Sequence, residues 1–379
     1  MKKGNRHLSD GDVVQILVDY RKDVRPYYEL VNAFNIILGS FMYERILGIK
    51  KRTRIVLMPK LAFNLAAKRG FRNKIELNLG VFPLVKALVI SVSKLNFVCP
   101  DILLDKSFDQ GKALADFADI LNVIYYQIDG YDLKDDHISE LLDESDLGIR
   151  ADFAYSLFKK TLYFLFCHEY THIRCRHASR IKNKNVIEFQ INTEESHDNV
   201  DFIRRKHWSE LEADHFGANL TIEMLGIFCK SMPGQYKRQI SDSEAKEVRQ
   251  VFLVIGLLFL AFSYRPDEKT SISFYQVYNH PHPCVRLANV CDVMANYISG
   301  MYSIDMQSVI DVMSDVLYML IRIARAVGVK EFDAIITNIN EIREEIHNIQ
   351  NGINKTWVDT SNNAMIETLI AVRKGVAIA

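Results

Sequence analysis

The sequence has no excess of charge of either sign. Among its 379 residues, 47 lysines and arginines balance 47 aspartates and glutamates, so the formal net charge is zero. A nucleic-acid-binding surface is usually strongly basic, and we therefore expect no nucleic-acid partner. Hydrophobic residues make up 49% of the chain and charged residues 25%, which is typical of a globular protein with a full core.

The sequence also has no paired cysteine motif. Its cysteines are scattered without Cys-x-x-Cys spacing, mostly in apolar surroundings. The six are Cys99, Cys167, Cys175, Cys229, Cys284 and Cys291. This pattern indicates reduced thiols, and we expect a cytoplasmic protein.

No uncharged stretch is long enough to predict a membrane span. The longest, from Gln250 to Tyr264, has 15 residues, whereas a span needs about 20. We expect it to form a buried helix; the alternative is an interfacial or re-entrant helix at a membrane surface. The first residues lead into polar sequence, so we expect no targeting signal.

The most informative motif is His168-Glu169-Tyr170-Thr171-His172, which lies in an apolar stretch predicted to be helical from about residue 152 to 176. Two histidines four residues apart project from one helix face and can bind the same metal ion. Glu169 is then within reach of a water on that metal, as in zinc peptidases. The alternative is a core helix whose histidines are satisfied by hydrogen bonds.

A catalytic zinc site needs a third protein ligand. Glu210 and Asp214 are four residues apart on a predicted helix over residues 209–228, so one can bind the metal while the other accepts an N–H from a ligating histidine. Glu212 lies about 200° around the helix from Glu210 and should face elsewhere. The small residues Ala213, Gly217 and Ala218 let this helix approach the first closely. A solvated acidic helix start is the alternative.

Two residues beyond the motif are weaker ligand candidates. On a continuing helix, His177 would lie opposite His168, so we expect a helix-end or surface residue. Cys175 returns to the stripe of His168, and we expect it to line the cleft floor or pack in the core, with a ligand role as the less favoured alternative.

The segment from His280 to Arg286 contains prolines at positions 281 and 283, which hold the backbone extended or turned before a helix. Its imidazole and guanidinium donors could stabilise an oxyanion beside a zinc ion. A rigid loop with a helix-start proline explains the segment equally well.

We expect an α+β, mainly helical fold with a zincin-like core and a small sheet beside the motif helix. Residues 54–58 and 75–79 read as strands and 82–95 as a helix, and the strand at 75–79 could be an edge that binds substrate by strand addition or an ordinary structural strand. The polar segment 179–206 could be a flap or an insertion.

Three regions are expected along the chain: an N-terminal helical segment at residues 1–50, the core at 51–300, and a C-terminal helical region at 301–379. A further helix is predicted at 246–263. A heptad pattern over 332–353 predicts a helical seam that forms a hairpin with residues 305–327 or, alternatively, a homodimer.

Together, the three motifs resemble the gluzincin metallopeptidases, in which His-Glu-x-x-His is followed by Glu-x-x-x-Asp and then by His-Pro-x-x-x-x-Arg. CAAX prenyl-protein endopeptidases and HtpX-like proteases share these motifs but are embedded in membranes. The chain is more similar to the soluble Lit-like phage-exclusion peptidases, which also have a further histidine after the first motif and a Glu-Ala-Asp. The resemblance covers roughly residues 50 to 300.

The resemblance implies a zinc-dependent endopeptidase that cleaves a host protein in response to phage, elongation factor Tu in the known type. The site residues that it implies are the zinc ligands His168, His172 and Glu210, the general base Glu169, the supporting Asp214, and His280 and Arg286 near the substrate. The alternatives are a metal-bound module for binding or sensing that is inactive or gated, and a membrane-associated protease in which residues 250 to 264 form an interfacial or re-entrant helix.

Overall fold

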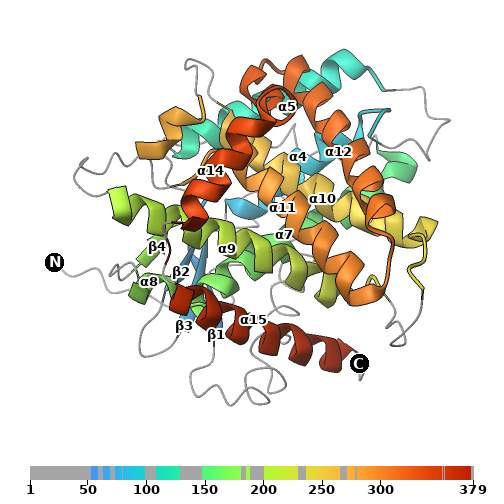
Figure 1. The fold of residues 1–379 in the computed structure, drawn as a ribbon. Helices are drawn as coiled ribbons and strands as arrows, with labels where there is room; N and C mark the ends of the chain where they lie inside the picture. Colours follow the sequence, from blue (N-terminus) through green and yellow to red (C-terminus); the bar gives the residue numbers. More distant parts are fainter. Residues whose placement is uncertain are drawn as a thin grey trace.

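The computed structural model describes residues 53–58, 63–68, 73–78, 80–98, 108–128, 147–180, 185–187, 200–228, 236–264, 271–277, 280–351, 353 and 355–376. The helical segment expected at residues 1–50 and the acidic stretch from Asp132 to Asp146 lie outside these residues, as does much of the 179–206 segment. The described part is mainly helical with one small sheet (Figure 1), which confirms the α+β, mainly helical class.

The sheet has four strands in the order β1-β3-β2-β4. They are β1 (Thr53–Met58), β2 (Leu65–Lys68), β3 (Asn73–Asn78) and β4 (Asn185–Ile187). β1 is parallel to β3, whereas β2 is antiparallel to both β3 and β4. The two predicted strands are therefore present. Of the two alternatives for the strand at 75–79, the free edge for substrate is wrong and the structural strand is confirmed, because Ile75 pairs with Ile55 on one side and with Ala67 on the other.

Helices supply the rest of the described fold. They are α4 (Val81–Ser93), α5 (Gln110–Ile128), α7 (Ala151–Arg174), α8 (His177–Arg180), α9 (Val200–Leu225), α10 (Asp242–Ser263), α11 (Pro283–Tyr302), α12 (Met306–Ala326), α13 (Ala334–Thr337), α14 (Ile339–Asn351) and α15 (Lys355–Val376), with short 3-10 turns η1 (Gly148–Arg150), η2 (Ser273–Val277) and η3 (Lys330–Asp333). α4, α7 and α10 match predicted helices closely. α9 begins nine residues before the predicted start at residue 209, at Val200.

α7 is the central helix of the molecule. It packs against α4, α9 and α10 and against strands β2 and β3 (Figure 1). Between Leu157 and Ile173 nearly every side chain is buried, because apolar residues occupy almost the whole circumference of the helix. The polar side chains of the motif therefore lie in the core, where buried polar groups require partners.

α10 contains most of the uncharged run from Gln250 to Tyr264. A capping box of Ser241 and Glu244 starts this helix, and every residue from Gln250 to Ser263 is buried. The prediction of a buried helix is confirmed. Among the described residues, no helix is both long and apolar enough to cross a membrane.

The heptad seam at 332–353 does not form one continuous helix. η3, α13 and α14 divide it, and Asn338, with φ −120°, separates the last two. α14 packs against α11 and α9, and of the three seam elements only η3 packs extensively on α12. The expected hairpin with residues 305–327 is thus replaced by packing on other helices. Four seam residues are buried within the chain, namely Phe332, Ile335, Ile342 and Ile349.

The C-terminal helix α15 packs on α9 and α7, along the lower edge of the view in Figure 1. Arg174, the last residue of α7, donates from Nε to Thr368 Oγ1 at 3.0 Å and from Nη2 to the carbonyl of Ala364 at 3.2 Å. The C-terminal region therefore contacts the helix that carries the metal-binding motif.

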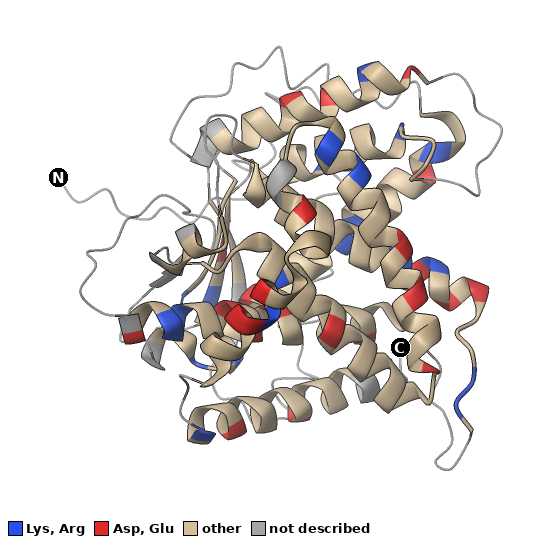
Figure 2. Ribbon diagram, turned by 45° about the horizontal axis from the view of Figure 1, so that its top comes forward, with Lys and Arg blue, Asp and Glu red and all other residues tan. Residues whose placement is uncertain are grey.

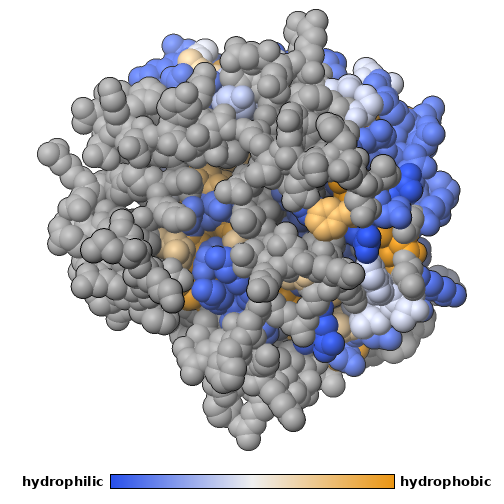
Figure 3. Space-filling view, turned by 90° about the vertical axis from the view of Figure 1, so that its left-hand side faces the viewer, coloured by the Kyte–Doolittle hydropathy of each residue, from blue (hydrophilic) through white to orange (hydrophobic). Residues whose placement is uncertain are grey.

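Charged residues of both signs are interspersed over the described helices (Figure 2). On the face drawn in Figure 3, the described residues that are visible are mostly hydrophilic, and apolar atoms appear only in small separate areas. The described residues visible on this face therefore form no large apolar patch.

The loop before α11 has the predicted proline-stiffened helix start. Pro283 occupies the first turn of the helix, and the N-cap His282 accepts a hydrogen bond at Nδ1 from the backbone N–H of Cys284 at 3.0 Å. His282 is 2% exposed, and burial lowers its pKa to about 4. The folded chain therefore holds His282 neutral at pH 7.

Acidification from pH 7 to pH 5 should destabilise the fold through His282. The pKa of an unfolded histidine is about 6.5, so between that pH and about 4 the unfolded chain binds a proton that the folded chain excludes. This difference amounts to about 2 kcal/mol between pH 7 and pH 5. His282→Asn keeps an N-cap acceptor but does not titrate. Urea unfolding of the metal-free proteins should show a loss about 2 kcal/mol smaller in the variant; equal losses would contradict this role.

Candidate metal centre

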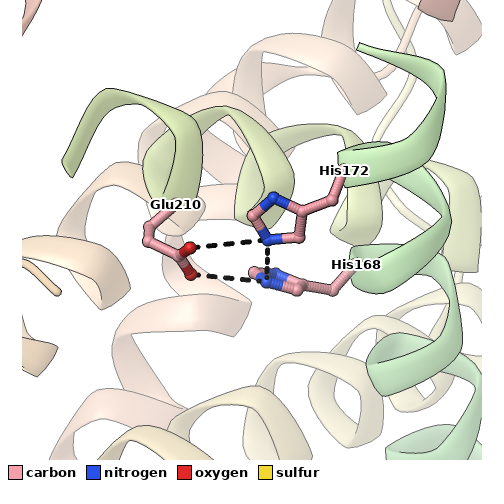
Figure 4. A group of neighbouring side chains, drawn as sticks. All are labelled: His168, His172 and Glu210. Carbon is pink, nitrogen blue, oxygen red and sulfur yellow. Dashed lines mark hydrogen bonds and ion pairs between the residues drawn. The ribbon is translucent and has the colours of Figure 1, made fainter. Parts of the chain in front are cut away.

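Three side chains from two helices converge on one point. His168 and His172 project from α7, and Glu210 projects toward them from α9 (Figure 4). The Nε2 atoms of the histidines are 2.9 Å apart, and each lies 3.5 Å from one oxygen of Glu210. Ligand atoms around a tetrahedral zinc ion lie about 3.3 to 3.6 Å apart. Two of the separations fall in this range and the third is shorter, so the group could hold a metal ion.

The centre is enclosed by protein. His168 and Glu169 are completely buried, and His172 and Glu210 are at most 3% exposed. Glu169 follows His168 on α7 and lies about 60° around the helix from His172, so both belong to one broad face. The predicted general base therefore occupies the core beside the candidate ligands.

Gly217 allows α9 to approach α7 this closely. A Cβ atom at this position would lie 3.0 Å from both Cα and N of His168. These are backbone atoms that cannot move aside without shifting α7. The expectation that small residues let the two helices approach is confirmed at this position, one turn beyond Asp214.

Asp214 holds His168 from behind, as predicted for a supporting residue. Its Oδ1 is 3.0 Å from His168 Nδ1. A carboxylate accepts hydrogen bonds, so it selects the tautomer with hydrogen on Nδ1 and leaves an electron pair on Nε2. Nε2 is the atom that faces Glu210 and His172.

Arg286 has a different role from the expected oxyanion donor. Its guanidinium donates from Nε to Asp214 Oδ2 at 2.7 Å and from Nη2 to Oδ1 at 2.8 Å, and it lies over the ring of Phe259 at 4.8 Å. This bidentate pair fixes the carboxylate that orients His168. Arg286 is 3% exposed, and its Nη2 also lies 3.6 Å from Glu210 Oε2.

His280 lies at the site as predicted. Its Nδ1 is 3.5 Å from Glu210 Oε2, and at 8% exposure it is the most exposed of the five residues His168, Glu169, His172, Glu210 and His280. The loop before α11 thus places a third imidazole beside Glu210, the carboxylate that would be the third ligand.

His177 is not the surface residue that helix continuation predicts. α7 ends at Arg174, and Arg176 adopts a left-handed conformation with φ 61°, so the chain turns back. His177 is fully buried. Its Nδ1 is 2.7 Å from His172 Nδ1 and its Nε2 is 2.6 Å from Glu212 Oε2. Glu212 does face away from Glu210, as expected, but it faces this histidine.

Neither His177 nor Glu212 was predicted from the sequence to belong to the site. The available signal was a third histidine just beyond the predicted helix end, together with a third carboxylate in the same acidic segment. Cys175, which is fully buried, forms a second group with them in which the potential ligand atoms lie within 4.8 Å of one another.

The hydrogen bonds also bear on the tautomer of His172. When His177 carries its hydrogen on Nε2 and donates it to Glu212, His177 Nδ1 is the acceptor for the Nδ1–H of His172. His172 Nε2 then carries a free electron pair, like His168 Nε2. Burial lowers the pKa of His172 well below its ordinary value, which keeps the ring neutral.

Three electron-pair donors thus converge, because Glu210 is ionised. Burial acts to raise the pKa of Glu210, but the histidines that surround this carboxylate more than offset the effect and hold its pKa well below the usual range. Two bare imidazole nitrogens and a carboxylate repel one another unless a cation lies between them. The donor set matches that of a His₂Glu zinc site.

Comparisons with protein-family models, with curated proteins and with solved structures gave no match. The resemblance to gluzincin and Lit-like peptidases therefore stays a prediction from motifs.

Removing one ligand should abolish stoichiometric metal binding. The purified protein is expected to contain about one zinc ion per chain, and His172→Ala should lose it, because two donors cannot hold zinc tightly in competition with water. Elemental mass spectrometry after chelator-free purification measures both. Absence of zinc, or of any other divalent metal, from the parent protein would show that these histidines are structural.

Gly217→Ala should weaken both the fold and the metal site. The added Cβ forces α9 away from the backbone of His168, and overpacking of this kind costs about 1 to 3 kcal/mol. Gly300→Ala in α11 is a matched control, because its Cβ meets nothing within 4 Å. Thermal unfolding and zinc titration of both variants test the prediction. Equal behaviour of the two variants would show that the close approach is not required.

Proposed function

We propose that the protein is a zinc-dependent endopeptidase. The convergence of His168 Nε2, His172 Nε2 and Glu210 on one point, with both histidine tautomers set by carboxylates, carries the proposal. These three residues would hold the ion. When bound there, zinc supplies Lewis acidity that polarises a carbonyl group and lowers the pKa of a water molecule.

Glu169 is the general base of the proposed reaction. It accepts a proton from the attacking water as the water oxygen bonds to the carbonyl carbon of the peptide. It then returns that proton to the nitrogen as the C–N bond breaks, so the products are a carboxylic acid and an amine. The core position of Glu169 excludes bulk water from competing for this proton.

His280 and Arg286 have separate roles in this proposal. His280 faces Glu210 from the loop before α11 and is placed to donate a hydrogen bond to the developing oxyanion. Arg286 keeps Asp214 in place and thereby orients His168. The motif resemblance extends the proposal to a host protein as substrate, such as elongation factor Tu, cleaved as a phage defence.

A second candidate function follows from the burial of the site. With Glu169 completely buried and the three ligands at most 3% exposed, a peptide cannot reach the general base without a movement of the chain. A metal-bound module for binding or sensing, gated or without activity, has the same geometry. Incubation with unfolded proteins and with elongation factor Tu separates the two functions, because a binder forms complexes but no fragments.

Glu169→Gln should abolish cleavage while leaving the fold and the zinc content unchanged. A general base typically contributes about 10²- to 10⁴-fold to the rate, so we expect a loss of at least about 100-fold. Glu345→Gln on α14 is the control, since it changes another buried carboxylate that bonds Gln276 outside the site. Fragment formation is followed by gel and mass spectrometry. Full activity in Glu169→Gln would refute the mechanism.

A further inference from the structure

A line of hydrogen bonds connects the candidate metal centre with the C-terminal helix. It runs from His172 to His177 at 2.7 Å and from His177 to Glu212 at 2.6 Å, and Ser361 of α15 donates to the same oxygen of Glu212 at 2.9 Å. All four side chains are at most 3% exposed. These residues come from α7, α8, α9 and α15, so four separate helices meet along this line.

We propose that His177, Glu212 and Ser361 are positioning residues that fix the tautomer of His172, so that metal affinity depends on the hydrogen bond that Ser361 of α15 donates to Glu212. The proposal rests on the metal site proposed above but not on peptidase activity. Outer partners of metal-bound histidines typically change metal affinity by about 10- to 100-fold. Here the outer partner of His172 is a second histidine, which relays the effect of a carboxylate.

The two candidate histidine ligands are supported in different ways. Asp214 contacts His168 directly and is itself held by Arg286 from α11. His172 has no carboxylate of its own at Nδ1, and His177 fills that place. Without His177, the Nδ1 of His172 would lose its acceptor in the core, and the ring could carry its hydrogen on Nε2, where it would block the metal.

Ser361 is the residue that connects α15 with this line. Other contacts dock the same helix without touching it: Thr368 accepts from Arg174 at 3.0 Å, and the ring of Trp357 lies 6.0 Å from the guanidinium of Arg205. Ser361 and Thr368 are both fully buried hydroxyl residues on α15. Removal of either hydroxyl loosens the docking of α15, but only removal of Ser361 changes the support of His172.

The competing interpretation is a second metal site. Cys175, His177 and Glu212 have potential ligand atoms within 4.8 Å of one another. However, both ring nitrogens of His177 already lie at hydrogen-bond distance from other groups, one from His172 and the other from Glu212. No ring nitrogen of His177 then remains for a metal, and the relay accounts for both contacts.

Zinc affinity, measured by competition with a chromophoric chelator, tests the proposal on the full chain. His177→Phe removes both hydrogen bonds at similar volume and should weaken zinc binding about 10- to 100-fold. Ser361→Ala should cause a smaller, several-fold loss, and Thr368→Val should cause none. Glu212→Leu should weaken zinc binding. Glu212→Gln keeps an acceptor oxygen and should therefore retain most of the zinc affinity. The absorption spectrum of the cobalt-loaded protein should change in the same order.

Unchanged affinity and spectrum in His177→Phe, or equal effects of Ser361→Ala and Thr368→Val, would overturn the proposal. Two zinc ions per parent chain, with one in Cys175→Ser, would also overturn it in favour of a second metal site. If His177→Phe fails to fold, as judged by circular dichroism of the metal-free chain, Glu212→Gln and the two α15 variants decide the question. Zinc binding that follows the predicted order without any cleavage would support this inference while refuting the peptidase.

Discussion

The contact between α7 and α9 is the interaction on which the candidate site depends. His168 and His172 belong to the first helix, and Glu210, Glu212 and Asp214 belong to the second. The distances between these five side chains therefore depend on how closely the two helices approach. Gly217 sets that distance, because a larger residue would meet the backbone of His168. The site is thus a product of helix packing, and its geometry is as rigid as the core around it.

Burial of so many polar groups is stable only when each proton has a defined place. Carboxylates outside the cluster fix the positions of these protons. Asp214 lies at Nδ1 of His168, and Glu212 acts on Nδ1 of His172 through His177. Arg286 compensates the charge of Asp214 with two hydrogen bonds. The hydrogens of both ligand rings consequently point outward and the electron pairs point inward. A cation at the centre would offset the repulsion between these inward electron pairs and the Glu210 carboxylate, which is strong in a medium of low dielectric constant.

Features within one continuous helix could be predicted from the sequence. The spacings of His168 with His172 and of Glu210 with Asp214 fix their relative directions through the helix period alone. Features that depend on where a helix ends, or on which elements pack together, could not be predicted in this way. His177 was misplaced because α7 stops at Arg174, the strand at 75–79 gained a second neighbour through the sheet order, and the heptad seam breaks at Asn338. Arg286 was correctly predicted near the site, but its hydrogen bonds to Asp214 depend on tertiary packing that the sequence does not reveal.

The supports of the site also limit how a substrate could approach it. Asp214, bonded to Arg286, lies at Nδ1 of His168, and the His177–Glu212–Ser361 line reaches Nδ1 of His172, so neither ring can turn toward a peptide without losing these partners. Among His168, Glu169, His172, Glu210 and His280, the most exposed is His280 at 8%, and it lies beside Glu210. For the proposed peptidase, His280 is therefore the residue of this group that a peptide could reach with the smallest displacement of the chain. Displacement of α15 would instead remove Ser361 from Glu212 and disturb the support of His172.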